Sequence, residues 1–536
     1  MSNVRIAIQL IENLVDQGVR RFCVCAGARN APLIEVLDRL SVVRPELWVK
    51  SFFDERAAGF FALGMSKYSM EPVAVLTTSG TAVAELLPAA IEAHYSGLPL
   101  VFLTADRPRA FRGSGAPQAI EQCGIFSYYA SQFYDIENIA MPVQISRQGL
   151  THINVCFAEP LIDEPIEPIL NFSEKLVESA NERPGERSKS VQRVAEFFEK
   201  VKRPLAIVSG ISLRNRGSVA EFLTALKAPV YVEAPSGLRE HQGIANWQLR
   251  TGTAALSARA FENYFDGVLR IGSVPTLRLW RDFDLQLRQV PVLSVHDLPF
   301  SGLSRDPLPA LSYSDFFFAY SQIVEQTATL DKNSSALTED ARASGVLENL
   351  LDRLNGSEAS FVRKLSEAIS SSAMVFLGNS LPIREWDLAA SWTTPHVNIF
   401  ANRGANGIDG LISTFLGAAA VSNREENWLI LGDLSALYDL NALANAGDMK
   451  VRVVVINNRG GQIFSRLFSG EKFLNAHKFS FENWARMFDF DYLRLGADTI
   501  RDDWAATIAK LEQRAVIELL PDNGQSNEFW REWGAL

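Results

Sequence analysis

The sequence contains little cysteine and little histidine. Its 536 residues include four cysteines and six histidines, with neither a CxxC pair nor an HExxH stretch. Paired cysteines and closely spaced histidines are the usual ligands of zinc in proteins. The common zinc sites are therefore disfavoured, and we predict that the four cysteines are reduced thiols, as in most intracellular proteins.

Positive charge and long apolar runs are also scarce. The 52 Lys and Arg residues are outnumbered by 62 Asp and Glu residues, which gives a net charge of −10. Nucleic-acid-binding proteins usually carry an excess of basic residues, so we expect no nucleic-acid partner. No apolar run of about 18 residues is present, and residues 1–24 lack the apolar core of a signal peptide. We therefore expect a cytoplasmic protein with no membrane partner.

Three widespread motifs are missing as well. The sequence contains no GxxxxGK[ST], no GxSxG and no GxGxxG. These motifs are typical of P-loop NTPases, α/β-hydrolases and dinucleotide-binding domains, so all three classes are disfavoured.

What the sequence does contain is an alternation of short apolar runs with amphipathic stretches, which is typical of parallel βαβ units. The polar stretch at 178–192 indicates a linker, and 327–345 is a second stretch expected to be weakly structured; between them they separate three blocks of similar size. We predict an α/β fold with three doubly wound parallel-sheet domains. The expected strands lie at 22–27, 72–78, 98–106, 204–210, 228–234, 267–273, 291–297, 372–378, 396–402, 427–433 and 451–458.

The strongest local signal lies in the third block. Asp433 follows one apolar run and Asn458 ends another, with Gly460 just beyond. Parallel strands of an open α/β sheet bring such positions to the ligand-binding edge. Carboxylate, amide and backbone carbonyl oxygens suit Mg²⁺, and Gly432 and Gly461 would let a diphosphate approach the backbone. The alternative is an ordinary strand-to-helix turn capped by Asp433.

A second signal lies in the stretch SFFDERAAGFFALGMSKYS at residues 51–69, where Glu55 precedes an Ala-, Gly- and Phe-rich helix. A carboxylate beside so much apolar surface could donate or accept a proton. The alternative is that Asp54 and Glu55 merely favour the start of the helix.

Several arginines stand beside Gly or Pro at the ends of expected strands. Arg29, Arg107 (with Arg112 and Gln118 just beyond) and Arg403 share this position. Arginine binds carboxylates through paired hydrogen bonds, so these residues could bind an acidic substrate. Each could equally form a surface salt bridge.

Seven motifs in order resemble one family of thiamin diphosphate enzymes, the 2-succinyl-5-enolpyruvyl-6-hydroxy-3-cyclohexene-1-carboxylate synthases of menaquinone biosynthesis. They are FFDERAAGFFALGMSK, TTSGTAVAELLPAAIEAHYSGLPLVFLTADRP, GAPQAI, GNSLPIREWD, NRGANGIDG, GDLSALYDLNAL and NNRGGQIF. The resemblance implies a pyrimidine-binding domain at 1–177, a central domain at 193–327 and a diphosphate-binding domain at 346–536. It also implies a homo-oligomer, a dimer or tetramer, whose active site is built between two subunits.

The resemblance further implies a transferase that uses thiamin diphosphate and Mg²⁺, which Mn²⁺ could replace. In the family, 2-oxoglutarate is decarboxylated and the remaining four-carbon unit adds to isochorismate. Glu55 would be the catalytic residue and would hydrogen-bond N1′ of the aminopyrimidine. Two rival readings remain open: a thiamin diphosphate lyase that acts on pyruvate, as acetolactate synthase does, and a catalytically silent homologue.

The family's other site residues map onto matching positions of this sequence. Substrate binding falls to Arg29, Arg107, Gln118, Arg278 and Arg403. Cofactor binding falls to Glu55, Gly432, Asp433, Ser435, Asn458, Ile463, Phe464 and Leu467, and metal binding to Asp433, Asn458 and Gly460. The sequence departs from the family at Ala26 and Ala28, where Pro and Ser are usual, at Arg278, where Lys is usual, and at Arg424, whose register with the family's basic residue is shifted.

Overall fold

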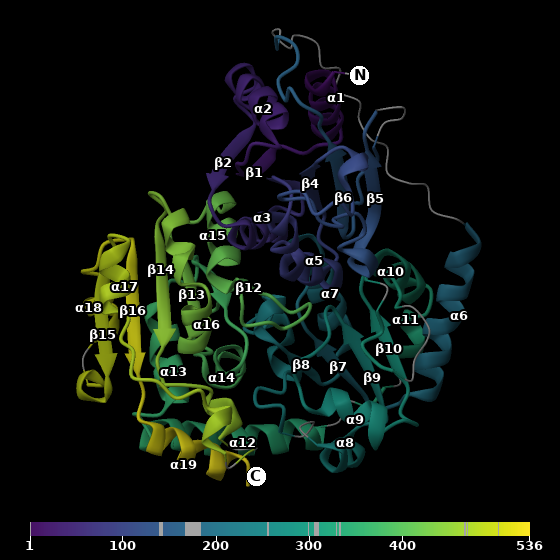
Figure 1. Cartoon of the computed structure of the whole chain (residues 1–536). Coiled ribbons are helices and arrows are strands. Elements are labelled where there is room, and N and C mark those ends of the chain that lie inside the picture. Colours follow the sequence, from purple (N-terminus) through teal and green to yellow (C-terminus); the bar gives the residue numbers. More distant parts are fainter. Residues whose placement is uncertain are drawn as a thin grey trace. The chain divides into compact units, whose positions relative to one another are not determined.

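The computed structural model describes residues 2–138, 143–166, 184–253, 257–298, 300–304, 310–327, 330–331, 334–465, 468, 470–501 and 503–535. These residues form three parallel sheets of six, four and six strands with helices against them (Figure 1). The predicted α/β class is thereby confirmed. The chain divides into two compact units. Unit 1 comprises Met1–Ala180, Gly404–Asn423 and Leu437–Met449; unit 2 comprises Asn181–Arg403, Arg424–Ala436 and Lys450–Leu536.

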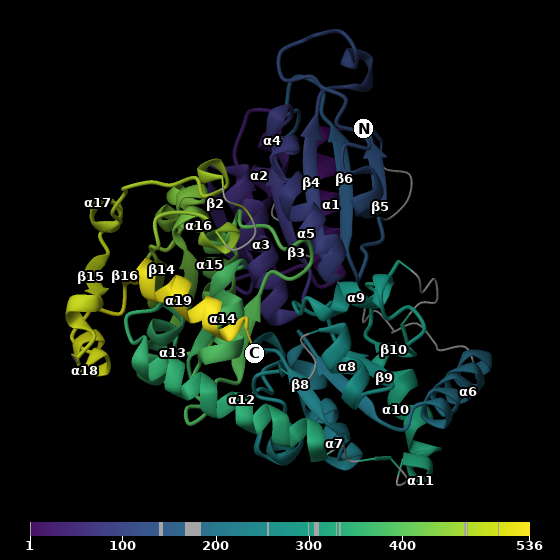
Figure 2. The same cartoon turned by 90° about the horizontal axis from the view of Figure 1, so that it is seen from below.

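The sheet of unit 1 has the order β2-β1-β3-β4-β6-β5, and every neighbouring pair is parallel. Side chains of α1 and α2 pack with β1, β3, β4 and β6 in one core, while α3 and α5 lie on the other side of the sheet (Figure 2). The strands are β1 (Arg21–Cys25), β2 (Trp48–Phe52), β3 (Val73–Thr77), β4 (Leu100–Asp106), β5 (Ala130–Ile136) and β6 (Leu150–Cys156). The helices are α1 (Asn3–Asp16), α2 (Ala31–Val43), α3 (Glu55–Ser69), α4 (Thr81–Ala84) and α5 (Leu87–Ser96).

Two later segments of the chain complete unit 1. The helix α15 (Leu411–Val421) packs against α3, and the short 3₁₀ segment η7 (Leu440–Asn445) packs against α15. Asp439, just before η7, ties these elements together: it accepts hydrogen bonds from Ser413 and pairs with Arg56 Nη2 at 3.1 Å. The first turn of α3 is therefore held by residues about 380 positions further along the chain.

The first sheet of unit 2 has the order β10-β9-β7-β8. Side chains of α6, α7 and α10 cover one face, and those of α8 and α9 cover the other. The strands are β7 (Pro204–Val208), β8 (Val230–Val232), β9 (Gly267–Ile271) and β10 (Val292–Val295). The helices are α6 (Pro184–Lys200), α7 (Arg216–Leu226), α8 (Ala258–Tyr264), α9 (Leu279–Leu285), α10 (Tyr313–Ser321) and α11 (Val324–Thr327).

The second sheet of unit 2, β12-β11-β13-β14-β16-β15, repeats the strand order of the unit 1 sheet. Side chains of α13, α14 and α18 cover one of its faces. The strands are β11 (Met374–Leu377), β12 (Asn398–Ala401), β13 (Asn427–Gly432), β14 (Val451–Ile456), β15 (Asp491–Gly496) and β16 (Ala515–Leu520). The helices are α12 (Ser334–Arg353), α13 (Glu358–Ala368), α14 (Leu381–Ala389), α16 (Asp433–Tyr438), α17 (Glu482–Met487), α18 (Trp504–Ile508) and α19 (Asn523–Trp533).

Both polar stretches are largely helical where the structure describes them, so the expectation that they lack regular structure was wrong. Residues 184–192 open α6, and residues 334–345 open α12. Their apolar positions are sparse, but Ala336, Ala343 and Leu347 are spaced so that they lie on one buried face of α12. Residues 178–183 lie outside the described residues. Among the described helices, none combines the length and the apolar character needed to cross a membrane.

Candidate active site

Two neighbouring strand ends in unit 2 bring the predicted metal-binding positions together. The register of β13 with β14 places Gly432 opposite Ile456, so the segments that follow both strands leave the sheet side by side. The Gly460 N–H donates a hydrogen bond of 2.9 Å to Asp433 Oδ2. The strand order changes direction between β11 and β13, and open α/β sheets bind ligands at such a point.

Asp433 is a buried carboxylate with only 2% of its surface exposed. Its Oδ1 accepts a hydrogen bond from the Leu434 N–H, and His477 Nε2 lies 3.1 Å from its Oδ2. Burial raises the pKa of the Asp433 carboxyl group, and the Gly460 N–H and His477 oppose that rise. Because burial makes the negative charge costly, a bound cation would stabilise it.

Asn458 and Gly460 supply the remaining candidate oxygens. The Asn458 Oδ1 atom is buried and has no hydrogen-bond partner among the described residues. Gly460 has φ +137°, and a Cβ there would overlap the Leu474 carbonyl oxygen, so only glycine fits this turn. A buried carboxylate, an unused amide oxygen and the backbone of a glycine turn form a donor set that fits a hard divalent cation.

The other predicted cofactor-binding residues of unit 2 lie at the end of β13 or on the segments that follow the same two strands. A Cβ built on Gly432 meets nothing within 4 Å, and Ser435 is buried in the first turn of α16. Ile463 and Phe464 lie in a short 3₁₀ turn just after Gly461, and Phe464 is 40% exposed. Leu467 lies outside the described residues.

Glu55 is the first residue of α3 in unit 1. Asp54 caps this helix by accepting a hydrogen bond of 3.0 Å from the Ala57 N–H. Asp54 thus accepts a hydrogen bond from one of the free N–H groups at the start of the helix. The half-buried Glu55 carboxylate has no hydrogen-bond or ion-pair partner among the described residues. The capping role proposed as an alternative belongs to Asp54, which leaves Glu55 available for a ligand.

Three predicted substrate-binding residues lie in unit 1 with different surroundings. Arg29 is buried and is held by the Phe157 carbonyl and by Glu159 Oε1, each at 3.1 Å. Arg107 Nε donates to the Pro117 carbonyl at 3.0 Å, which braces the loop that also carries Gln118. Gln118 is exposed and has φ +56°.

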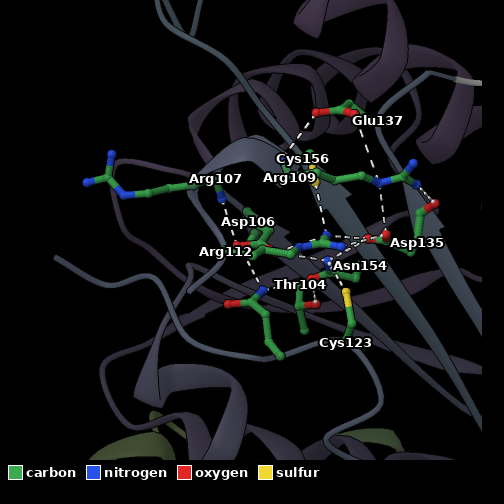
Figure 3. Close-up of polar contacts among 12 residues, drawn as sticks. Thr104, Asp106, Arg107, Arg109, Arg112, Cys123, Asp135, Glu137, Asn154 and Cys156 are labelled. Atoms are coloured by element: carbon green, nitrogen blue, oxygen red, sulfur yellow. Dashed lines mark hydrogen bonds and ion pairs between the residues drawn. The ribbon is translucent and has the colours of Figure 1, made fainter. Parts of the chain in front are cut away.

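Arg112, by contrast, uses both of its terminal guanidinium nitrogens within the chain. Its guanidinium makes two hydrogen bonds to Asp135, at 2.7 and 2.9 Å, and one to Asp106 at 3.3 Å, and Asn154 donates to both aspartates (Figure 3). Burial raises the pKa of Asp135, but the hydrogen bonds from Arg112 and Asn154 bring it below its ordinary value. The Arg107 guanidinium points away from this cluster (Figure 3). Arg112 therefore anchors the loop instead of facing a ligand.

The remaining arginines lie in unit 2. Arg278 is exposed at the start of α9. Arg403 Nη1 donates a hydrogen bond of 2.8 Å to Asn379 Oδ1. Arg424 donates to Asn398 Oδ1 at 3.2 Å.

Sequence reasoning missed several residues that the structure places beside these groups. Asn379 follows β11, and its motif GNS was a signal that could have found it. His477 reaches Asp433 from 44 residues further along the chain, and Glu358 contacts Asn458 from 100 residues before it. No spacing rule in the sequence connects such distant positions.

Known proteins resemble the chain over most or all of its length. The family model described as "Thiamine pyrophosphate enzyme, N-terminal TPP binding domain" matches residues 4–125. The 2-succinyl-5-enolpyruvyl-6-hydroxy-3-cyclohexene-1-carboxylate synthase of Bdellovibrio bacteriovorus is 43% identical, with 100% of this chain and 99% of the relative covered. Synthases of the same name are 36% identical in Akkermansia muciniphila (96% and 95% covered) and 33% identical in Geobacillus kaustophilus (86% and 84% covered).

Proposed function

Because the chain belongs to the family of 2-succinyl-5-enolpyruvyl-6-hydroxy-3-cyclohexene-1-carboxylate synthases, we propose that it decarboxylates 2-oxoglutarate and joins the product to isochorismate in menaquinone biosynthesis. The full-length identity to synthases of this name carries the proposal. The chain is thus a thiamin diphosphate-dependent transferase that forms a carbon–carbon bond.

The oxygen set in unit 2 supports cofactor binding. Asp433, the Asn458 Oδ1 atom and the Gly460 carbonyl would hold Mg²⁺, or Mn²⁺ in its place. Gly432 and Ser435 would adjoin the diphosphate, and Ile463, Phe464 and Leu467 would pack against the cofactor. When bound, thiamin diphosphate supplies a carbon nucleophile and an electron sink for decarboxylation.

The Glu55 carboxylate would hold a proton in a hydrogen bond to N1′ of the aminopyrimidine. Its lack of a partner among the described residues supports this role, because a carboxylate already paired within the chain would have to break that pair first. Asp54, which caps the helix, would keep Glu55 in place.

The substrates explain the dispersed arginines. 2-Oxoglutarate and isochorismate each carry two carboxylates, and guanidinium groups bind carboxylates in pairs of hydrogen bonds. We therefore assign substrate binding to Arg29, Arg107, Gln118, Arg278 and Arg403. A substrate carboxylate at Arg29 would take over the contact that Glu159 now makes.

We further propose the assembly, domain division and location of the enzyme. The three functional parts would be 1–177, 193–327 and 346–536, with Glu55 of one subunit serving the diphosphate site of another in a homodimer or homotetramer. Phe53, beside Asp54 and Glu55, is 70% exposed, so a second subunit that met Glu55 would also cover this ring. The four free cysteines support a cytoplasmic location.

The decisive experiment measures CO₂ release from 2-oxoglutarate by purified protein with thiamin diphosphate and Mg²⁺, with and without isochorismate. We expect release that requires the cofactor and rises with isochorismate. Release from pyruvate but not from 2-oxoglutarate would overturn the substrate assignment. Cofactor binding without release from either 2-oxo acid would identify a silent homologue.

A further inference from the structure

The side-chain amide of Asn458 is held at only one of its two ends. Its Nδ2 donates a hydrogen bond of 2.8 Å to Glu358 Oε2, whereas its Oδ1 has no partner among the described residues. Both residues are buried, with 2% of Glu358 and 6% of Asn458 exposed. An amide has nearly the same shape when its oxygen and nitrogen are exchanged, so a hydrogen-bonding neighbour must select the orientation.

A carboxylate selects the orientation because it can only accept hydrogen bonds. Glu358 therefore fixes Nδ2 on its own side and turns Oδ1 away from it. The backbone of Asn458 is held separately, since its carbonyl accepts hydrogen bonds from Asn523 at 3.0 Å and Gln462 at 3.3 Å. Glu358 thus acts on the direction of the amide and not on the path of the chain.

The neighbouring Asn457 provides an internal comparison. Its Nδ2 donates to another buried carboxylate, Glu518, at 2.6 Å, but its Oδ1 accepts a hydrogen bond from the Arg459 N–H at 3.2 Å. Both ends of the Asn457 amide are therefore used within the chain. Only Asn458 of this pair presents an unused buried oxygen.

We propose that Glu358 is a positioning residue that orients the Asn458 amide, so that Oδ1 is presented to the divalent cation shared with Asp433 and Gly460. This inference rests on the proposed function, which requires that cation. Glu358 begins α13, and its own N–H is held by Ser526 Oγ at 3.0 Å, so the helix places the carboxylate independently of any ligand.

The test measures how tightly the full chain binds Mn²⁺ in the presence of thiamin diphosphate. The electron paramagnetic resonance signal of free Mn²⁺ reports how much of the ion remains unbound. In Glu358→Gln, the new amide could donate to Oδ1 and turn Asn458 around. We expect its Kd for Mn²⁺ to rise at least about 10-fold, as is typical when a residue that orients a ligand is lost. The matched control, Glu518→Gln, should keep its Kd within about twofold of the wild type.

A double variant separates orientation from damage to the fold. When Glu358→Gln is combined with Asn458→Asp, the carboxylate introduced at position 458 has two equivalent oxygens. The amide introduced at position 358 would donate to one of them and leave the other for the cation. We expect this pair to bind Mn²⁺ within about threefold of the wild type. Unchanged binding by Glu358→Gln, or a double variant as weak as that single variant, would overturn the inference. Failure of the wild type to bind Mn²⁺ would instead refute the proposed function.

Discussion

At the scale of the residue, the hydrogen bonds of individual polar groups bear on which of them can meet a ligand. Glu55 and the Asn458 Oδ1 atom have no partner among the described residues, although each is at least half-buried. Arg112 looks as suitable for substrate binding as Arg107 in the sequence, but it forms ion pairs with Asp106 and Asp135. Leaving a buried polar atom unpaired costs free energy, so a ligand that met the Asn458 Oδ1 atom beside Asp433 would recover that cost.

The first prediction concerns Glu55. Glu55→Gln keeps the shape of the side chain but removes its ability to hold or release a proton, so the rate of CO₂ release from 2-oxoglutarate should fall about 100-fold or more. Steady-state kinetics at saturating cofactor measures this. Glu35→Gln, on the exposed side of α2, serves as the control and should be unaffected. Near-normal turnover of the Glu55 variant would disprove the proton-holding role.

Part of this site could be predicted from the sequence. The meeting of Asp433 with Gly460 follows from parallel strands whose ends share one edge. The contacts of Glu358 and His477 with this site could not be predicted. Both residues lie far from Asp433 and Asn458 in the sequence, and no local pattern indicates that the fold packs them together. The pairing of Arg112 with Asp135 escaped prediction for the same reason.

At the scale of the element, the contact between α3 and α15 depends on glycine. A Cβ at Gly64 would overlap the carbonyl oxygen of Thr414, and a Cβ at Gly417 would overlap that of Phe61. The two helix backbones therefore touch directly. In the sequence this appears only as an Ala- and Gly-rich face, which predicts a helix but not its partner.

The second prediction follows from this contact. Gly64→Ala should destabilise the protein by about 3 kcal/mol or more, because the backbones must separate to admit the methyl group. Denaturant unfolding followed by circular dichroism measures the loss. Gly345→Ala, in the exposed part of α12 with open space around it, should instead be neutral or stabilise by up to about 1 kcal/mol. Equal effects of the two substitutions would contradict the close contact.

The strands show which elements a sequence reveals. All eleven predicted apolar runs contain a strand, because strands buried on both faces are apolar throughout. The edge strands β2, β5 and β15 were missed; their partly exposed positions carry polar residues such as Lys50, Gln132 and Arg494. The buried β6 and β16 were also missed; β6 carries the buried polar residues Thr151, His152 and Asn154, and β16 carries the buried Glu518, which interrupt an apolar run.

At the scale of the whole molecule, stability should depend on a buried acidic residue of unit 2. Asp387 accepts a hydrogen bond of 2.6 Å from the Ala234 N–H, which joins α14 to the segment after β8. Burial, together with the nearby Glu233, raises the pKa of Asp387 to about 8. The native state thus binds this proton more tightly than the unfolded chain does.

The third prediction is the resulting pH dependence. Because the pKa of Asp387 is raised in the native state, its bound proton stabilises the folded protein fully below pH 4. This stabilisation is lost as the pH rises through about 8. Asp387→Asn keeps the acceptor for Ala234 but cannot ionise, so at pH 9 it should be more stable than the wild type by about 1–2 kcal/mol. Unfolding midpoints at pH 5.5 and 9 measure this. The control variant Asp448→Asn, at an exposed position, should change neither midpoint. If Asp387→Asn and the wild type differed by the same amount at pH 5.5 and pH 9, the raised pKa of Asp387 would be refuted.

The fourth prediction tests the assembly. Glu55→Gln and Asp433→Asn should each be inactive alone, but mixed dimers would contain one site that carries both substitutions and one that carries neither. Co-expression should therefore restore up to about a quarter of wild-type activity if each site draws on two subunits. Mixing either variant with the double variant should restore none. A co-expressed pair that stays inactive would place each site within one chain.

The discontinuous make-up of unit 1 limits how its gene can be recombined. A chimaera joined near residue 180 would take α3 from one parent and α15 and Asp439 from the other. Both parents would then need glycine at positions 64 and 417 and the Arg56–Asp439 pair. Otherwise α3 and α15 of the hybrid would not pack against each other correctly. Hybrids that take 404–423 and 437–449 from the same parent as the N-terminal segment should therefore fold more often than those made by a simple cut between the first and second sheets.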